Sequence, residues 1–408
     1  MTHDHRLATP VAVALNRRTV LQATALTLLG AGAATQSRAA RAQEATPQPE
    51  APAANGAFPV DVQLALHEIV ERNLAATESP GALVGVWQPG HGEWQHAAGL
   101  ADITTGRAVS LDDHVRIASN SKAFTATAVL QLVDDGLVGL DDPIETYVPG
   151  IPNGEEITVR QVLGMDAGIA DYIAIPEITA EYAANPMMPM GPDEILAIIR
   201  SSTPDYAPGA EIRYSNSNYI VLGFLLEAVT GQTAEAAITE RVITPLGLTG
   251  TSVPYTAFMP EPSMHGYFAE NLGDPLIDVT RSNPRFPWTA GSIISTLADM
   301  RAWGEALAQG TLLSPETQAA RETWRPFNPA APGVAYGLGL LNFNGLIGHN
   351  GGIAGYSSWI LHEPASGFTI VIVVNRAGEK GGTADPFLHD ILALLLPGDL
   401  PSAATPTA

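Results

Sequence analysis

Strand-like segments lie near both ends of the globular part of this chain, and helix-like segments fill its middle. Ala82–Gln88 and Glu93–Gly99 alternate between apolar and polar residues, and the Pro89–Gly92 segment between them carries a turn signal. Three further strand-like segments stand near the other end: Gly337–Leu341, Tyr356–His362 and Phe368–Asn375. This order predicts an α+β fold, in which both ends of the chain build one antiparallel sheet and a mainly helical region, about residues 140–290, is inserted.

Helical periodicity marks the remaining segments. Apolar residues recur at helical spacing between Asp61 and Thr77, and a long apolar helix is expected from Ser119 to about Asp135. Three more segments have the same character: Pro192–Ser201, Ser217–Thr230 and Asp385–Leu395. No internal repeat is present, so residues 58–396 are expected to form one catalytic domain.

The first 42 residues have the features of an export signal. Arg17 and Arg18, an apolar stretch to about Ala34 and the small residues around Arg41 resemble a twin-arginine signal peptide. The apolar stretch is shorter than the roughly 20 residues that span a bilayer, so no stable membrane anchor is expected. Residues 43–57 and 397–408 are rich in Pro and Ala and are expected to be a flexible linker and tail. The sequence therefore predicts an exported protein, periplasmic or extracellular, and leaves its oligomeric state open.

Charge and cysteine content exclude several classes of function. The 408 residues include 20 basic and 42 acidic side chains, a formal net charge of −22, so a nucleic-acid partner is not expected. The absence of cysteine excludes disulfides, thiolate nucleophiles and cysteine-bound metals. The G-x-S-x-G motif of α/β-hydrolases and the H-E-x-x-H motif of zinc hydrolases are also missing.

Ser119 and Lys122 stand three residues apart at the start of the long apolar helix. A serine at this place is most often a helix cap. Residues three apart share one helix face, however, so the Lys122 ammonium can return to the Ser119 hydroxyl. The sequence contains only two lysines, Lys122 and Lys380, against 18 arginines. Because a desolvated lysine can release its proton and an arginine cannot, a lysine here suits proton transfer.

Two further motifs have simple structural explanations when each is taken alone. Tyr214-Ser215-Asn216 would be a turn that caps the next helix, and His349-Asn350-Gly351-Gly352 would be a glycine turn before a late strand. Together with Ser119-x-x-Lys122 they follow the order S-x-x-K, Y-x-N, H-x-G. In this order the chain resembles the serine β-lactamase and D-alanyl-D-alanine carboxypeptidase family, in the branch with Tyr in the second motif and His in the third. The resemblance covers about residues 60–395.

This resemblance implies an acyl-enzyme mechanism that needs no metal or organic cofactor. Ser119 would be the nucleophile, with Lys122 and Tyr214 as the groups that move protons. Which of these two is the acylation base stays open, although a Tyr214 phenolate favoured by the Lys122 charge is one expectation. The remaining implied residues are Asn216, His349 and Gly351 to orient substrate, the backbone N–H groups of Ser119 and Gly352 as an oxyanion hole, and Trp288 as a candidate wall of the cleft.

The expected substrate is a small molecule or a peptidoglycan-like peptide, and its class stays open. Hydrolysis of D-alanyl-D-alanine peptides or β-lactams is the first expectation; a carboxylesterase, a D-amino-acid amidase and a silent penicillin-binding module are the alternatives. Carboxypeptidases of this branch place an arginine just after the Y-G-L-G-L run, where this chain has Leu341. The missing arginine weakens the carboxypeptidase interpretation, because that side chain pairs with the substrate carboxylate.

Overall fold

The computed structural model describes residues 56–326, 333–377 and 384–397. The expected signal peptide, nearly all of the expected linker and the tail beyond Pro397 lie outside these ranges, so export stays a prediction. Within the described residues, no single helix is long and apolar enough to cross a membrane. One bent pair, Asn216–Thr230 with Ala234–Ile243, reaches the required length and composition only when taken together.

The main sheet joins the two ends of the chain, as the sequence predicts. Strand β1 pairs antiparallel with the hairpin strand β2 on one side and with the late strand β13 on the other, so that Val86 lies opposite both Trp94 and Ile370. In the described part of the chain the strand order is β3-β2-β1-β13-β12-β11-β10-β9-β8. The bounds of these strands are β1 Gly81–Gln88, β2 Gly92–Asp102, β3 Arg107–Ala108, β8 Arg325–Pro326, β9 Val334–Tyr336, β10 Leu341–Phe343, β11 Leu346–Ile353, β12 Tyr356–Glu363 and β13 Phe368–Val374.

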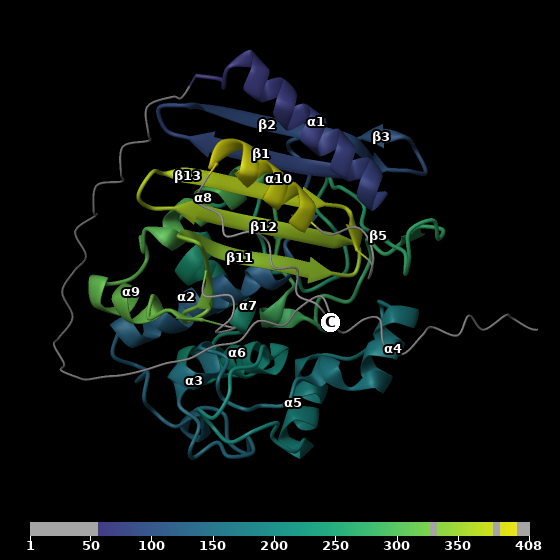
Figure 1. Cartoon of the computed structure of the whole chain (residues 1–408). Helices are drawn as coiled ribbons and strands as arrows, with labels where there is room; N and C mark the ends of the chain where they lie inside the picture. The colour runs from purple at the N-terminus through teal and green to yellow at the C-terminus, as the bar shows by residue number, and fades with distance from the viewer. Residues whose placement is uncertain (1–55, 327–332, 378–383, 398–408) are drawn as a thin grey trace, which may run out of the picture.

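Helices cover both faces of this sheet. Figure 1 shows α1 (Val60–Thr77) and α10 (Asp385–Leu395) across one face, with α8 (Leu297–Ala308) behind the other. Helix α2 (Ser121–Asp134) packs against α8, and the rings of Phe124 and Trp303 stack with their centroids 3.8 Å apart. Strand β13 is buried along its whole length because it is covered on both faces, which explains why its sequence, FTIVIVV, does not alternate.

In Figure 1 the helical region lies below the sheet, on the side of strand β11. It holds α3 (Val159–Leu163), α4 (Pro176–Ala184), α5 (Pro192–Ser201), α6 (Asn216–Thr230), α7 (Ala234–Ile238) and the π-helical turn η4 (Thr239–Ile243), and α9 (Pro315–Arg321) follows α8. The inserted region is therefore helical as far as residue 243. Residues 244–290 contain mostly loops, with the short strands β5 (Tyr267–Phe268) and β6 (Ile277–Asp278).

Two expected elements differ from the structure. Gly337–Leu341 was expected as a strand, but residues 337–340 form the turn between β9 and β10, with Gly339 in a left-handed conformation at φ 84°. A side chain at Gly339 would also run into the Ala126 side chain. His349 was expected before a strand, and it lies inside β11. The glycines after His349 predict a turn where the structure has strand β11, and the structure has a turn at Gly339 where the sequence predicts a strand.

Candidate active site

Ser119 lies in a tight 3₁₀ turn, η1 (Ala118–Asn120), between the two-residue strand β4 (Val115–Arg116) and α2. It therefore precedes the helix that it was expected to begin. Ala118 adopts a left-handed backbone with φ 52°, which costs a residue with a side chain about 1 kcal/mol. Neighbouring groups hold this strained turn: the Asn120 amide donates to Ile117 O at 3.1 Å and to the Ser358 hydroxyl of β12 at 2.9 Å.

Strand β11 passes directly beside this turn. A side chain at Gly351 would collide with the Ile117 carbonyl oxygen and would lie 3.0 Å from the Ala118 Cβ, so only glycine allows this approach. At Gly352 the same position opens into free space, and this residue is exposed. The pairing of β11 with β10 covers only residues 346–348, so the edge of β11 at Gly351 and Gly352 faces η1 instead of another strand.

Lys122 returns to Ser119 as the three-residue spacing predicts. Its Nζ donates to Ser119 Oγ at 3.1 Å, to Asn216 Oδ1 at 2.8 Å and to Ala290 O at 2.8 Å. Ala290 ends the 3₁₀ turn η5 (Trp288–Ala290). The side chain is fully buried, and burial lowers the pKa of Lys122 to about 7, although the negative charge of Asp171 partly opposes this shift. Lys122 therefore exchanges its proton near neutral pH.

The ring of Tyr214 lies beside this lysine, with its centroid 4.8 Å from Nζ. Burial raises the pKa of Tyr214 well above its ordinary value, so the resting side chain is a neutral phenol and not the phenolate expected from the sequence. Ser119 lies near enough to oppose this pKa shift, but the two hydroxyls do not reach hydrogen-bond geometry. The Tyr214 hydroxyl has no hydrogen-bond partner, which leaves it able to donate a proton.

Both ring nitrogens of His349 have partners other than the nucleophile Ser119. Its Nε2 lies 3.2 Å from the Tyr336 hydroxyl and its Nδ1 lies 2.5 Å from Asn350 O, while its ring centroid is 6.3 Å from that of Tyr214. Burial, and next the charge of Lys122, lower the pKa of His349 to about 3, so the imidazole is neutral at working pH. The sequence predicts that His349 orients substrate, but a role beside Tyr214 fits this position better.

Asn216 begins α6 and connects Lys122 to a carboxylate that sequence reasoning missed. Its Nδ2 donates to Asp171 Oδ2 at 3.0 Å. Asp171 is the N-cap of the 3₁₀ turn η3 (Tyr172–Ala174) and remains partly accessible, yet burial of its carboxylate raises the pKa to about 6, against the hydrogen bonds from Asn216. An aspartate before a turn is a common cap, so only the folded structure shows that it belongs to the site.

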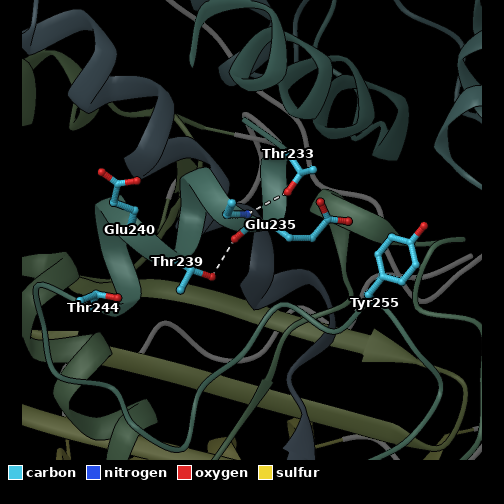
Figure 2. Close-up of a pocket in the computed structure, with 7 residues that line it drawn as sticks. Thr233, Glu235, Thr239, Glu240, Thr244 and Tyr255 are labelled. Atoms are coloured by element: carbon cyan, nitrogen blue, oxygen red, sulfur yellow. Dashed lines mark hydrogen bonds between the residues drawn. The ribbon is translucent and has the colours of Figure 1, made fainter. Parts of the chain in front are cut away.

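Trp288 does not form a wall of this cleft. It is buried, its indole Nε1 donates to Glu235 Oε1 at 2.8 Å, and its ring packs against Phe224. Glu235 also accepts from Arg285 at 2.8 Å and borders a separate groove of about 540 Å³, which Figure 2 shows between Thr233 and Tyr255. Trp288 is therefore a core side chain, and its hydrogen bond explains why a polar indole edge is tolerated inside.

The described residues include no cluster of three or more acidic or histidine side chains that could bind a metal ion. The polar groups that surround Ser119 are instead an amine, a phenol, an amide and a carboxylate. Such a set can move protons and bind a polar acyl group beside the serine.

Residues 66–394 match the family model described as Beta-lactamase. The chain belongs to the beta-lactamase family. The resemblance to penicillin-recognising serine hydrolases is thereby confirmed, and so is the fold of helices around an antiparallel sheet.

Curated relatives share about 30% of their residues with this beta-lactamase-family chain. A D-aminopeptidase from Brucella anthropi is 30% identical over 325 residues, which cover 78% of this chain and 60% of that protein. Protein flp from Staphylococcus aureus strain COL is 28% identical over 334 residues, covering 78% of this chain and 64% of that protein. The chain thus spans less than two thirds of the length of these relatives.

Two solved structures of similar size match the beta-lactamase-family chain more fully. A D-stereospecific amidohydrolase from Streptomyces sp. is 32% identical with a TM-score of 0.73, covering 82% of this chain and 98% of that one. The D-amino acid amidase from Ochrobactrum anthropi SV3 is 25% identical with a TM-score of 0.72, covering 82% and 99%.

Proposed function

We propose that this protein is a serine hydrolase that cleaves amides of D-amino acids carrying a free amino group, through an acyl-enzyme on Ser119. The observation that carries this proposal is the position of Asp171, whose carboxylate is hydrogen-bonded to Asn216 beside Lys122. By family resemblance Asn216 orients the acyl part of the substrate, so an ammonium next to the acyl carbon would lie near Asp171. A carboxylate can accept further hydrogen bonds after the one from Asn216.

The other side of the site supports the same substrate class. Leu341 stands where carboxypeptidases of this branch have an arginine, and it is buried in β10 opposite Gly348. The buried Arg376 is engaged elsewhere and donates to Glu78 and Asn271. An amide or ester without a terminal carboxylate therefore loses no favourable contact at position 341. The D-configuration is proposed from the similarity to a D-aminopeptidase, a D-stereospecific amidohydrolase and a D-amino acid amidase.

In the proposed reaction Lys122 takes the proton of Ser119 across their 3.1 Å hydrogen bond, while Oγ forms a bond to the substrate carbonyl carbon. A pKa of about 7 makes neutral Lys122 abundant at pH 7 to 8. The backbone N–H groups of Ser119 and Gly352 would stabilise the oxyanion, each by about 3 kcal/mol. As the C–N bond breaks, the Tyr214 phenol protonates the leaving nitrogen and recovers a proton from Lys122. Water then attacks the acyl carbonyl carbon and gives a proton to neutral Lys122. As the bond from this carbon to Ser119 Oγ breaks, Lys122 returns the proton to Oγ and the free acid is released.

The test compares kcat/KM for four substrates: D-phenylalanine amide, its N-acetyl derivative, L-phenylalanine amide and a D-alanyl-D-alanine peptide. A charge-assisted hydrogen bond contributes roughly 1.5–3 kcal/mol, so loss of the ammonium should cost about ten- to a hundredfold. The free D-amide is expected to be hydrolysed fastest. A preference for the D-alanyl-D-alanine peptide would restore the carboxypeptidase interpretation, and a preference for the acetylated amide would exclude ammonium recognition.

A further inference from the structure

The side-chain amide of Asn216 joins two charged groups. Its oxygen accepts from Lys122 Nζ at 2.8 Å, and its nitrogen donates to Asp171 Oδ2 at 3.0 Å. If the amide were flipped, its NH₂ would face the ammonium and its oxygen would face the carboxylate, so that neither contact could be a hydrogen bond. The two charges together therefore allow only one orientation of Asn216.

Asp171 is itself held in place. Its side chain accepts from Ile173 N at 3.4 Å as the cap of η3. The next residue, Tyr172, donates its N–H to Ser217 Oγ at 3.0 Å and its hydroxyl to Phe286 O at 2.9 Å. Since Ser217 follows Asn216 in α6, this turn and the Tyr-x-Asn motif are fixed against each other. These contacts fix the backbone beside Asp171 and keep its carboxylate within reach of the amide.

We propose that Asp171 is a positioning residue for Lys122: its carboxylate fixes Asn216 so that the amide oxygen faces the lysine, and its charge favours the ammonium form. The proposal rests on the serine-hydrolase chemistry above but not on the identity of the amide, because Lys122 serves every substrate. It is also separate from binding of a substrate ammonium by the same carboxylate.

The charges around Lys122 make the effect of Asp171 measurable. The other titratable groups packed around this lysine and its neighbouring tyrosines are Tyr214, Tyr219, Tyr336, His349 and Arg321. Burial raises the pKa values of the tyrosines, and the pKa of His349 is about 3, so these groups are neutral near pH 7. Burial lowers the pKa of Arg321 to about 10, so it stays cationic. Among these described groups, Asp171 supplies the negative charge.

Removing the charge of Asp171 should change the pKa of Lys122 in a defined direction. In Asp171→Asn the burial of Lys122 is less opposed, so its pKa falls further below its ordinary value. Acylation needs neutral Lys122, and the acid limb of the kcat/KM profile therefore moves to lower pH. Only the Asn216 amide, with one hydrogen bond to each group, separates Asp171 from Lys122. We therefore expect the acid limb to shift by about one pH unit. A purely structural loss would lower the rate at every pH without moving this limb.

The experiment uses p-nitrophenyl acetate, which has no amino group for Asp171 to bind. Asp171→Asn and Asp171→Ser, a second neutral variant, should move the acid limb down by about one unit and reduce kcat about tenfold, while Asp171→Glu should keep the limb near its original place. Asp166→Asn is the matched control: Asp166 lies in the same loop, is buried with a pKa near 7, and forms no hydrogen bond with Asn216. This control should leave the limb in place.

The two lysines of the chain allow a direct second readout. In protein labelled with ¹³C-lysine, the signal of Lys122 should titrate near pH 7 and at lower pH in Asp171→Asn. An unchanged Lys122 titration, or a shift caused by Asp166→Asn alone, would overturn the proposal. If D-phenylalanine amide is no substrate but the limb moves, the positioning role stands and the proposed substrate class fails. If Asp171→Asn loses only the activity on D-phenylalanine amide and the limb stays in place, the proposed substrate class stands and the positioning role fails.

Discussion

The Nζ atom of Lys122 lies 3.1 Å from the Oγ atom of Ser119, and it is fixed there by two neutral acceptors, Asn216 Oδ1 and Ala290 O. All three contacts are hydrogen bonds to oxygen, so the ammonium is held without direct contact with a carboxylate. Burial then lowers the pKa of Lys122 to about 7. This combination allows one side chain to hold the serine hydroxyl and to accept its proton.

Lys122→Arg should inactivate the enzyme nearly as completely as Lys122→Ala. Arginine keeps the positive charge but does not release its proton at working pH, and its planar head does not fit the place of an ammonium. Loss of a general base typically costs about 10²–10⁴-fold in rate. Measurement of kcat with p-nitrophenyl acetate checks this, and substantial activity in the arginine variant would show that Lys122 is only a fixed charge.

Stability should rise with pH because of the same lysine. The folded pKa of Lys122 is about 7 and the unfolded pKa is about 10.4, so the unfolded chain binds the additional proton between these values. The resulting destabilisation is largest below pH 7 and disappears as the pH approaches 10. The free energy of unfolding, compared with that of Lys122→Met to cancel other groups, should increase by about 1 kcal/mol per pH unit in this window. A constant difference between the two proteins would contradict a depressed pKa.

Two neighbouring glycines should respond differently to the same added methyl group. Gly351→Ala would press a Cβ against the Ile117 carbonyl and push β11 away from the nucleophile turn, with a loss of about 1–3 kcal/mol in stability and a large loss of activity. Gly352→Ala points into open space and keeps its N–H, so it should fold normally and retain most activity. Chemical denaturation and ester hydrolysis measure both effects. Equal losses in the two variants would show that the close approach of β11 to η1 does not determine stability or activity.

The absence of arginine at position 341 can be tested in both directions. A D-alanyl-D-alanine peptide and its C-terminal amide should be hydrolysed with similar kcat/KM, because nothing at Leu341 binds the carboxylate. Leu341→Arg should shift the ratio toward the free acid, by up to about ten- to a hundredfold. The side chain at position 341 is buried, so the folded state of the variant is checked by circular dichroism. A strong preference of the original enzyme for the acid would show that another cation binds it.

Local patterns predicted the parts of the site that depend on local geometry. The spacing of Ser119 and Lys122 gave their contact, because residues three apart face each other on any helical turn. The pairing of β1 with β13 followed from the placement of strands at both ends of the chain. The left-handed backbone of Ala118 did not follow, because it depends on the approach of Gly351 from a strand more than 200 residues later.

Electrostatic properties and long-range contacts were the parts that sequence could not predict. The neutral Tyr214 results from burial, which no motif records. His349 points to Tyr336 because both lie on neighbouring parts of the sheet. Asp171 meets Asn216 across 45 residues of sequence, and its own surroundings resemble an ordinary helix cap.

Covalent trapping of Ser119 is the most direct test that this serine is the nucleophile. The protein is incubated with an activated ester or a penicillin, and its intact mass and its peptides are measured. One acyl group per chain is expected, on the peptide that contains Ser119, with no adduct in Ser119→Ala. That variant should fold normally, because it removes one hydroxyl whose hydrogen bond with Lys122 contributes about 1 kcal/mol. An adduct on Ser121 or Ser215 instead, or an adduct that persists in Ser119→Ala, would contradict the assignment of Ser119 as the nucleophile.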